Sequence, residues 1–229
     1  MKFTNFSVDT IVIGEFSKRQ ITLKTPDDKP IRIQIPKMYM PFGVSGFTPD
    51  WGAVKWNIDF SMKGFDDNDE NEVKKFYEFL RSIEQKVISN IKDNSVSIFG
   101  SRQTMKELEN NFNSNIKITP GREPKLRVKV DTVSSSDNNI KPQIYDGVSN
   151  IQISEKASSS LFAHKSGTAI IELGNVYFMN KKFGLTWRLY QMKVFEPQQQ
   201  QHNLKGFQFN EKEGEDEDET KLSGFMFLV

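Results

Sequence analysis

The stretch Phe183-Gly-Leu-Thr-Trp-Arg-Leu-Tyr-Gln-Met-Lys-Val-Phe195 decides the fold that this sequence predicts. Apolar and polar side chains alternate around Trp187, the period of two that is typical of a half-buried β-strand. Arg188 and Tyr190 then lie on the outward face, where a cation stands next to an aromatic ring. The strand therefore predicts both a core face and a binding face. The inward set is Leu185, Trp187 and Leu189.

Other segments upstream of this strand show β-like patterns of their own. Gly174 interrupts one of them and predicts a bend or bulge. The short run Pro41–Phe47 contains glycines but no phosphate-binding motif, and it is interpreted as a turn. The spacing of the segments, with long connections, favours a barrel or sandwich over a parallel βαβ sheet. The predicted strands lie in Val8–Gly14, Gln20–Lys24, Ile31–Ile35, Trp56–Met62, Lys125–Val130 and Thr168–Met179.

Two helices interrupt the strand pattern. Apolar residues recur at steps of three and four from Val73 to Ile91, which predicts one long amphipathic helix. An acidic cluster at positions 66–72 lies at its start, where the positive end of the helix dipole favours acids. This position explains the cluster without a metal. A shorter helix is predicted from Ser101 to Phe112.

Composition excludes several classes of protein. The chain has 229 residues and no cysteine, which excludes disulfides, thiolate metal sites and cysteine nucleophiles. No segment approaches the ~18 uninterrupted apolar residues of a membrane span, and the first residues lack a signal peptide's apolar run. We therefore expect an intracellular protein with no membrane partner.

The common catalytic signatures are missing from the sequence. It has no nucleophile elbow, no P-loop, no HExxH and no EF-hand pattern. We expect neither an enzyme nor a bound metal or cofactor. His164 and Lys165 could contact a phosphate, although such residues are more often polar loop side chains.

The net charge of +1 hides an asymmetry. Residues 211–229 carry seven acids and two lysines, a net charge of −5, and residues 1–210 carry +6. A basic body with an acidic tail predicts a polyanion-binding surface and a segment that competes for it. The alternative is a tail that only improves solubility.

Binding a nucleic-acid strand needs cations for the phosphates and exposed rings on which bases stack. The predicted strand at Lys125–Val130 presents three cations on one face. Two lysines precede the strand of Trp187, and Trp51 falls in a loop. The alternative is an ordinary half-polar sheet whose exposed face is basic. The candidate DNA-binding residues are Trp51, Lys125, Arg127, Lys129, Lys181, Lys182, Arg188, Tyr190 and Lys193.

The C-terminal strands also resemble a known family. The segments Ala163–Phe178 and Lys182–Val194 are similar to the single-stranded DNA-binding proteins of giant and algal nucleocytoplasmic large DNA viruses, which are related to that of short-tailed bacteriophages. Gly-Leu-Thr-Trp, ending at Trp187, is the most specific part. Weaker similarities follow the family order at Tyr39–Ser45, at Ser97–Phe99 after the long helix, and at Pro124–Val130.

The resemblance implies a mainly β protein with an OB-fold-like barrel, over residues 1–210, and a flexible acidic and apolar C-terminal tail, 211–229. It implies that the helices are inserted in the barrel, and that Ser97–Phe99 is a strand. The implied activity is non-catalytic binding of single-stranded DNA in viral replication, recombination and repair, in the host cytoplasm (the viral factory) or the nucleus. Further implied partners are replication proteins that bind the tail, and a second copy in a homodimer or higher oligomer. A structural or adaptor module and an RNA-binding protein stay open as alternatives.

Overall fold

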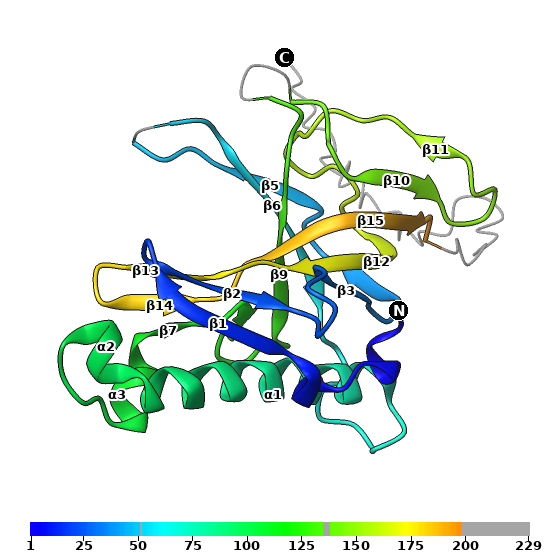
Figure 1. Ribbon diagram of the computed structural model, residues 1–229. Coiled ribbons are helices and arrows are strands. Elements are labelled where there is room, and N and C mark those ends of the chain that lie inside the picture. Colours follow the sequence, from blue (N-terminus) through cyan, green and yellow to red (C-terminus); the bar gives the residue numbers. More distant parts are fainter. Residues whose placement is uncertain (51, 135–137, 198–229) are drawn as a thin grey trace, which may run out of the picture. The chain divides into compact units, whose positions relative to one another are not determined.

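The computed structural model describes residues 1–50, 52–134 and 138–197 (Figure 1). Trp51 and the acidic segment 211–229 lie outside the described residues. The unit Met1–Pro197 is mainly β, and its described residues form three α-helices. This confirms the predicted mainly β class.

The strands form two groups, and one long helix, Glu72–Asp93, lies along one side of them (Figure 1). The strands are β1 (Val12–Ser17), β2 (Gln20–Lys24), β3 (Ile31–Gln34), β4 (Met38–Met40), β5 (Val44–Phe47), β6 (Lys55–Ser61), β7 (Phe112–Asn113), β8 (Ile116–Lys117), β9 (Lys125–Val130), β10 (Gln143–Asp146), β11 (Gln152–Ile153), β12 (Lys165–Leu173), β13 (Val176–Met179), β14 (Lys182–Gly184) and β15 (Trp187–Phe195). The helices are α1 (Glu72–Asp93), α2 (Ser95–Phe99) and α3 (Met105–Asn111), and short 3-10 turns cover Phe3–Asn5 and Val8–Thr10.

The larger sheet is organised around β15. Its order is β11-β10-β15-β9-β6-β5, and β12 pairs antiparallel with β15 along most of its length. Figure 1 shows β12 and β15 side by side through the middle of the molecule. Strands β3 and β4 pair with the other edge of β12, whereas β5, the next strand along the chain, pairs with β6.

The predicted alternation is confirmed on the two strands that matter for binding. On β9, Leu126 and Val128 are fully buried while the three cations between and beside them are partly exposed. On β15, Trp187 is 2 % exposed and Tyr190 is 45 % exposed. Both strands thus turn their apolar face to the core, and the predicted register is confirmed.

A β-bulge changes the phase of β15. Ile170 of β12 is opposite Gln191, but the next residue of β12 is opposite Leu189, so Tyr190 has no partner on β12. Counting by twos from Arg188 would place Lys193 in the core. The extra residue shifts the count by one, so that Lys193 is exposed on the same outward face as Arg188.

The smaller sheet has the order β1-β2-β13-β14-β7 and contains two tight hairpins. The turns between their strands are Lys18–Arg19 and Asn180–Lys181, and all four residues have positive φ, between 50° and 65°. Two-residue turns with positive φ at both positions match the type I′ class that fits the strand twist. Because β2 pairs with β13, the two turns lie at the same end of the sheet.

Helix α1 begins and ends close to the predicted positions. The Asn71 side chain accepts a hydrogen bond from the Val73 amide at 2.8 Å, which caps the first turn. Its apolar stripe, including Phe76, Leu80 and Ile83, is buried. Among the described residues, no helix has the length and apolarity needed to cross a membrane.

Four sequence expectations are wrong in detail. Ser97–Phe99 is not a strand: it belongs to helix α2, which Gly100 ends in the left-handed conformation at φ 77°. The chain therefore has two short helices, α2 and α3, among its described residues, where the sequence predicts one.

Val8–Thr10 is a 3-10 turn and not part of a strand, because the Thr10 amide donates to the Ser7 carbonyl. The segment Pro41–Phe47 is a turn only in its first part, since β5 begins at Val44 and pairs with β6. The stretch from Phe183 to Phe195 is two strands, β14 and β15.

Candidate nucleic-acid interface

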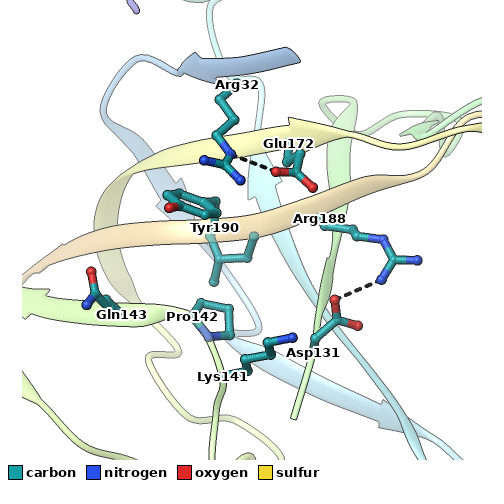
Figure 2. A pocket seen from close by; sticks show the side chains of 9 residues that line it. Arg32, Asp131, Lys141, Pro142, Gln143, Glu172, Arg188 and Tyr190 are labelled. Atoms are coloured by element: carbon teal, nitrogen blue, oxygen red, sulfur yellow. Dashed lines mark hydrogen bonds and ion pairs between the residues drawn. The ribbon is translucent and has the colours of Figure 1, made fainter. Parts of the chain in front are cut away.

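A cavity of about 480 Å³ lies over the outward face of β3, β12 and β15 (Figure 2). We call it the Tyr190 cavity. Strand pairing builds it, because Glu172 on β12 is opposite Arg32 on β3 and opposite Arg188 on β15. Its wall combines three cations, two carboxylates and one exposed ring: Arg32, Lys141, Arg188, Asp131, Glu172 and Tyr190.

The ring of Tyr190 carries a guanidinium on its face. The Cζ atom of Arg32 lies 3.8 Å from the ring centroid, and Figure 2 shows the guanidinium above the ring. The Nε atom of Arg32 also donates to the Glu172 carboxylate at 2.6 Å. The cation is thus held from two sides, and the outward ring is part of an ordered cluster.

Asp131 holds two cations of neighbouring strands. Its carboxylate accepts from Lys129 at 2.7 Å and from Arg188 at 3.0 Å. Burial works to raise the pKa of Asp131, but the hydrogen bond and charge of Lys129 and the charge of Arg188 outweigh it, so that the pKa lies below its ordinary value. Asp131 therefore stays ionised at neutral pH and offsets part of the positive charge.

Arg127 and Lys125 are engaged with protein groups on the outward face of β9. The guanidinium of Arg127 forms two hydrogen bonds of 2.8 Å with the carboxylate of Asp59, which is buried. This bidentate pair raises the pKa of Arg127. The Nζ atom of Lys125 lies 4.6 Å from the ring centroid of Phe42. Their roles in DNA binding stay predictions.

The remaining predicted cations are divided between two places. Lys193 lies on the outward face of β15, and its Nζ donates to the Asn150 side-chain oxygen. Lys181 and Lys182 instead lie at the β13–β14 hairpin and line a separate cavity of about 340 Å³ with Arg19 and Phe178. The structure does not bring the two hairpin lysines into the Tyr190 cavity, and their role stays a prediction. Trp51 is outside the described residues.

The sequence interpretation missed the four other charged residues of the Tyr190 cavity: Arg32, Lys141, Asp131 and Glu172. Arg32 stands between the buried Ile31 and Ile33, so alternation alone places it outward. Its partner Glu172 is 140 positions away. Only the pairing of β3 with β12 brings the two together, and no local pattern indicates that pairing.

Comparison with known proteins gives one sequence relative and several solved structures. No family model matches the chain. Uncharacterized protein L291 of Acanthamoeba polyphaga mimivirus is 26% identical over 182 residues, which cover 77% of this chain and 28% of that protein. The chain therefore spans little more than a quarter of the length of this relative.

The solved structures are single-stranded DNA-binding proteins of phages. Gp2.5 of bacteriophage T7 matches with a TM-score of 0.46 and 8% identity, over 87% of this chain and 100% of that one. The protein from bacteriophage Enc34, in complex with single-stranded DNA, matches with a TM-score of 0.38 and 10% identity, over 82% and 96%. The chain is thus a distant relative of a mimivirus protein, and its structure is similar to those of phage single-stranded DNA-binding proteins.

Proposed function

We propose that this protein binds single-stranded DNA, without catalysis, along the outward face of β15. The observation that carries the proposal is the exposed Tyr190 ring in an open cavity between Arg32 and Arg188. A base that displaces the Arg32 guanidinium can stack on this ring, and the two guanidiniums can then contact the phosphates on either side of it. Every base offers a flat face, so this mode of binding predicts little sequence preference.

The charge of the site supports a reversible contact. Arg188 and Lys141 line the Tyr190 cavity, and Lys193 follows on the same face of β15. Asp131 and Glu172 already pair with two of the cavity's three cations. A phosphate bound to either arginine must therefore share its guanidinium with a carboxylate, which lowers the net gain and favours exchange of the strand.

The strand pairing supports an OB-type barrel, a class that often binds single strands. The segment 31–47 pairs with β12 through β3 and β4, and with β6 through β5, so that it can close a ring of strands. In this barrel type, the loops between the first and second strands and between the fourth and fifth contact oligonucleotides. With 31–47, β6, β9, β12 and β15 taken as the five barrel strands in chain order, the segment between the first two contains Trp51, and the segment between the last two contains Lys181 and Lys182, which supports their predicted roles.

We further propose that the protein acts in viral DNA replication, recombination and repair. The sequence relative is a protein of Acanthamoeba polyphaga mimivirus, which supports a viral setting. Replication proteins and a second copy of the chain are the proposed protein partners. An RNA-binding protein and an adaptor with an acidic protein partner are the competing functions.

A titration separates these functions. Labelled oligo-dT, oligo-rU and a duplex of equal length are each titrated with the full chain, and fluorescence anisotropy reports binding. We expect oligo-dT to bind more tightly than the duplex, with oligo-rU no tighter than oligo-dT. Preference for oligo-rU would identify an RNA-binding protein. Absence of binding to all three would contradict the proposal and favour the adaptor.

A further inference from the structure

We propose that β15 carries a second nucleotide subsite, with Phe195 as its stacking ring and Lys37 and Lys193 as its phosphate contacts. This inference rests on the proposed function, since the ligand is a second nucleotide of the same DNA strand. The candidate residues from the sequence include Lys193 but neither Phe195 nor Lys37. The subsite begins where the Tyr190 cavity ends.

A second cavity, of about 340 Å³, continues along β12 and β15 from the first. We call it the Phe195 cavity. The bulge at Tyr190 makes this continuity possible, because it returns Lys193 to the outward face. Strand β15 advances about 3.3 Å per residue, so Tyr190 and Phe195 are roughly 16 Å apart along it. That distance leaves room for separate nucleotides at the two rings.

The Phe195 ring packs against a glycine backbone and also contacts the ammonium group of a lysine. The backbone of Gly147 approaches the ring so closely that a Cβ there would lie 2.3 Å from it. The Nζ atom of Lys37 lies 4.0 Å from the ring centroid. A lysine has four rotatable bonds, so its ammonium can leave the ring and contact a phosphate when a base arrives.

The two subsites differ in how their cations are paired. In the Tyr190 cavity, Arg32 and Arg188 each form an ion pair with a carboxylate. Among the described residues, neither Lys37 nor Lys193 forms an ion pair, and the partner of Lys193 is the neutral amide of Asn150. Their positive charge is therefore less compensated, and it favours a polyanion at this end of β15.

The wall of the Phe195 cavity also offers amide groups. Gln34 and Gln191 both line it, and the side chain of Gln191 donates to Gln143 at 3.0 Å. An amide carries donors and an acceptor and can turn to present either. Such groups can contact the polar edge of different bases, which agrees with binding of low sequence preference.

The test compares Phe195→Leu with Tyr190→Leu and with a control, Phe6→Leu. Phe6 is also a half-buried ring, but it packs against Phe79 of helix α1. Each full-length variant is titrated with oligo-dT of 4 to 16 nucleotides, the range of site sizes for one OB fold. Thermal unfolding of each variant is measured in parallel.

We expect Phe195→Leu to weaken binding of the longer oligonucleotides by up to about 5- to 150-fold, the range for loss of one stacked base. The shortest oligonucleotides, which reach only one ring, should lose less. Phe6→Leu should bind as the unchanged chain does. If Tyr190→Leu weakens binding while Phe195→Leu does not, the second subsite is wrong and the proposed function stands. If neither variant affects binding, both are wrong.

A second variant covers the case in which Phe195→Leu fails to fold. Lys37 is exposed, so Lys37→Gln should leave thermal unfolding unchanged. If Lys37 contacts one phosphate, the slope of log affinity against log salt should become shallower by about 0.7. If Lys37→Gln has the same slope as the chain without substitutions, the second subsite is wrong. The slope of the chain without substitutions tests the proposed function separately, because it reports whether phosphates are bound at all.

Discussion

Asp131 accepts hydrogen bonds from Lys129 of β9 and from Arg188 of β15, at 2.7 and 3.0 Å. These two cations are opposite each other in the parallel register of the two strands. Like charges at such positions repel. The carboxylate between them therefore allows the sheet to bring two cations together at the edge of a binding cavity.

Asp131→Asn should tighten binding of single-stranded DNA at low salt. Loss of the carboxylate frees Lys129 and Arg188 for phosphates, and an exposed ion pair is worth about 0.2–1 kcal/mol, which corresponds to a gain of up to about 5-fold. Anisotropy titrations with oligo-dT measure the change. The gain should shrink as salt increases.

The control for this variant is Glu109→Gln, which removes an exposed acid from helix α3. It changes the net charge by the same amount but lies outside the Tyr190 cavity. Equal gains in both variants would mean that only net charge matters. Weaker binding by Asp131→Asn would show that the carboxylate positions the cations for the strand.

Tyr190→Leu should weaken binding of oligo-dT by up to about 5- to 150-fold, which corresponds to the ~1–3 kcal/mol that one stacked base is worth. The ring is 45 % exposed, so the temperature of unfolding should change little. Tyr77→Leu is the control, because Tyr77 lies on helix α1, where its ring packs against Phe65. A large loss of stability in Tyr190→Leu with intact DNA binding would contradict the stacking role.

The affinity of the unchanged chain should depend strongly on salt. Neutralisation of four to six phosphates predicts a slope of log affinity against log salt of roughly −3 to −4 for a single strand. Titrations at several salt concentrations give the slope.

Lys193→Gln should make this slope shallower by about 0.7, whereas Lys106→Gln on α3 should leave it unchanged. A flat response would rule out binding through phosphates.

Arg127→Gln should reduce stability more than it reduces DNA binding. The variant leaves Asp59 buried without its partner, at a cost of about 1–3 kcal/mol in the free energy of unfolding. Urea denaturation measures this cost. The control is Lys125→Gln, at the preceding outward residue of β9. It removes the same positive charge but leaves Asp59 paired with Arg127. An Arg127→Gln protein of unchanged stability that binds DNA poorly would place Arg127 in direct contact with the strand.

Glu84 on α1 should make stability depend on pH. Burial raises its pKa above the ordinary 4.5, even though Ser114 and Arg81 donate to its carboxylate. As pH rises through this range, the unfolded chain loses the proton before the folded chain does, so the free energy of unfolding falls. This loss is complete once folded Glu84 has also ionised.

Glu84→Gln removes the titrating carboxyl group. The free energy of unfolding of this variant, compared with that of the chain without substitutions, should therefore rise as pH increases from 4 to 7. Urea denaturation at each pH gives the comparison. Glu78→Gln, at an exposed position of the same helix, should show no such trend. A constant difference between Glu84→Gln and the unchanged chain would mean that the carboxyl titrates normally.

Local patterns predicted the parts of this fold that depend on nearby residues. The alternation on β9 and the apolar stripe of α1 are properties of short segments, and both are confirmed. Helix α2 was missed because its five residues are too few for a helical period, and its end depends on the backbone of Gly100.

The Tyr190 cavity could be predicted only in part, because strand pairing creates it. Arg188 and Tyr190 are recognisable from β15 alone. The carboxylates that hold the cations come from Glu172 and Asp131, on other segments, and no periodicity shows which strands are neighbours. Lys181 and Lys182 are close to β15 in the sequence. In the structure they lie at the β13–β14 hairpin of the smaller sheet and line a different cavity.

The bulge at Tyr190 stores binding information in the length of a strand rather than in the identity of a side chain. Deleting one residue between Leu189 and Met192 would restore regular pairing with β12, and every named amino acid downstream would survive. Lys193 would still be opposite Thr168 and Met192 opposite the buried Ala169, so the outward face of β15 would only have one position fewer. An aligned relative with one position fewer here would therefore keep Arg188 and Lys193 on the same face but bring them closer together, so a gap at this point changes the spacing of the ligand contacts rather than their side of the sheet.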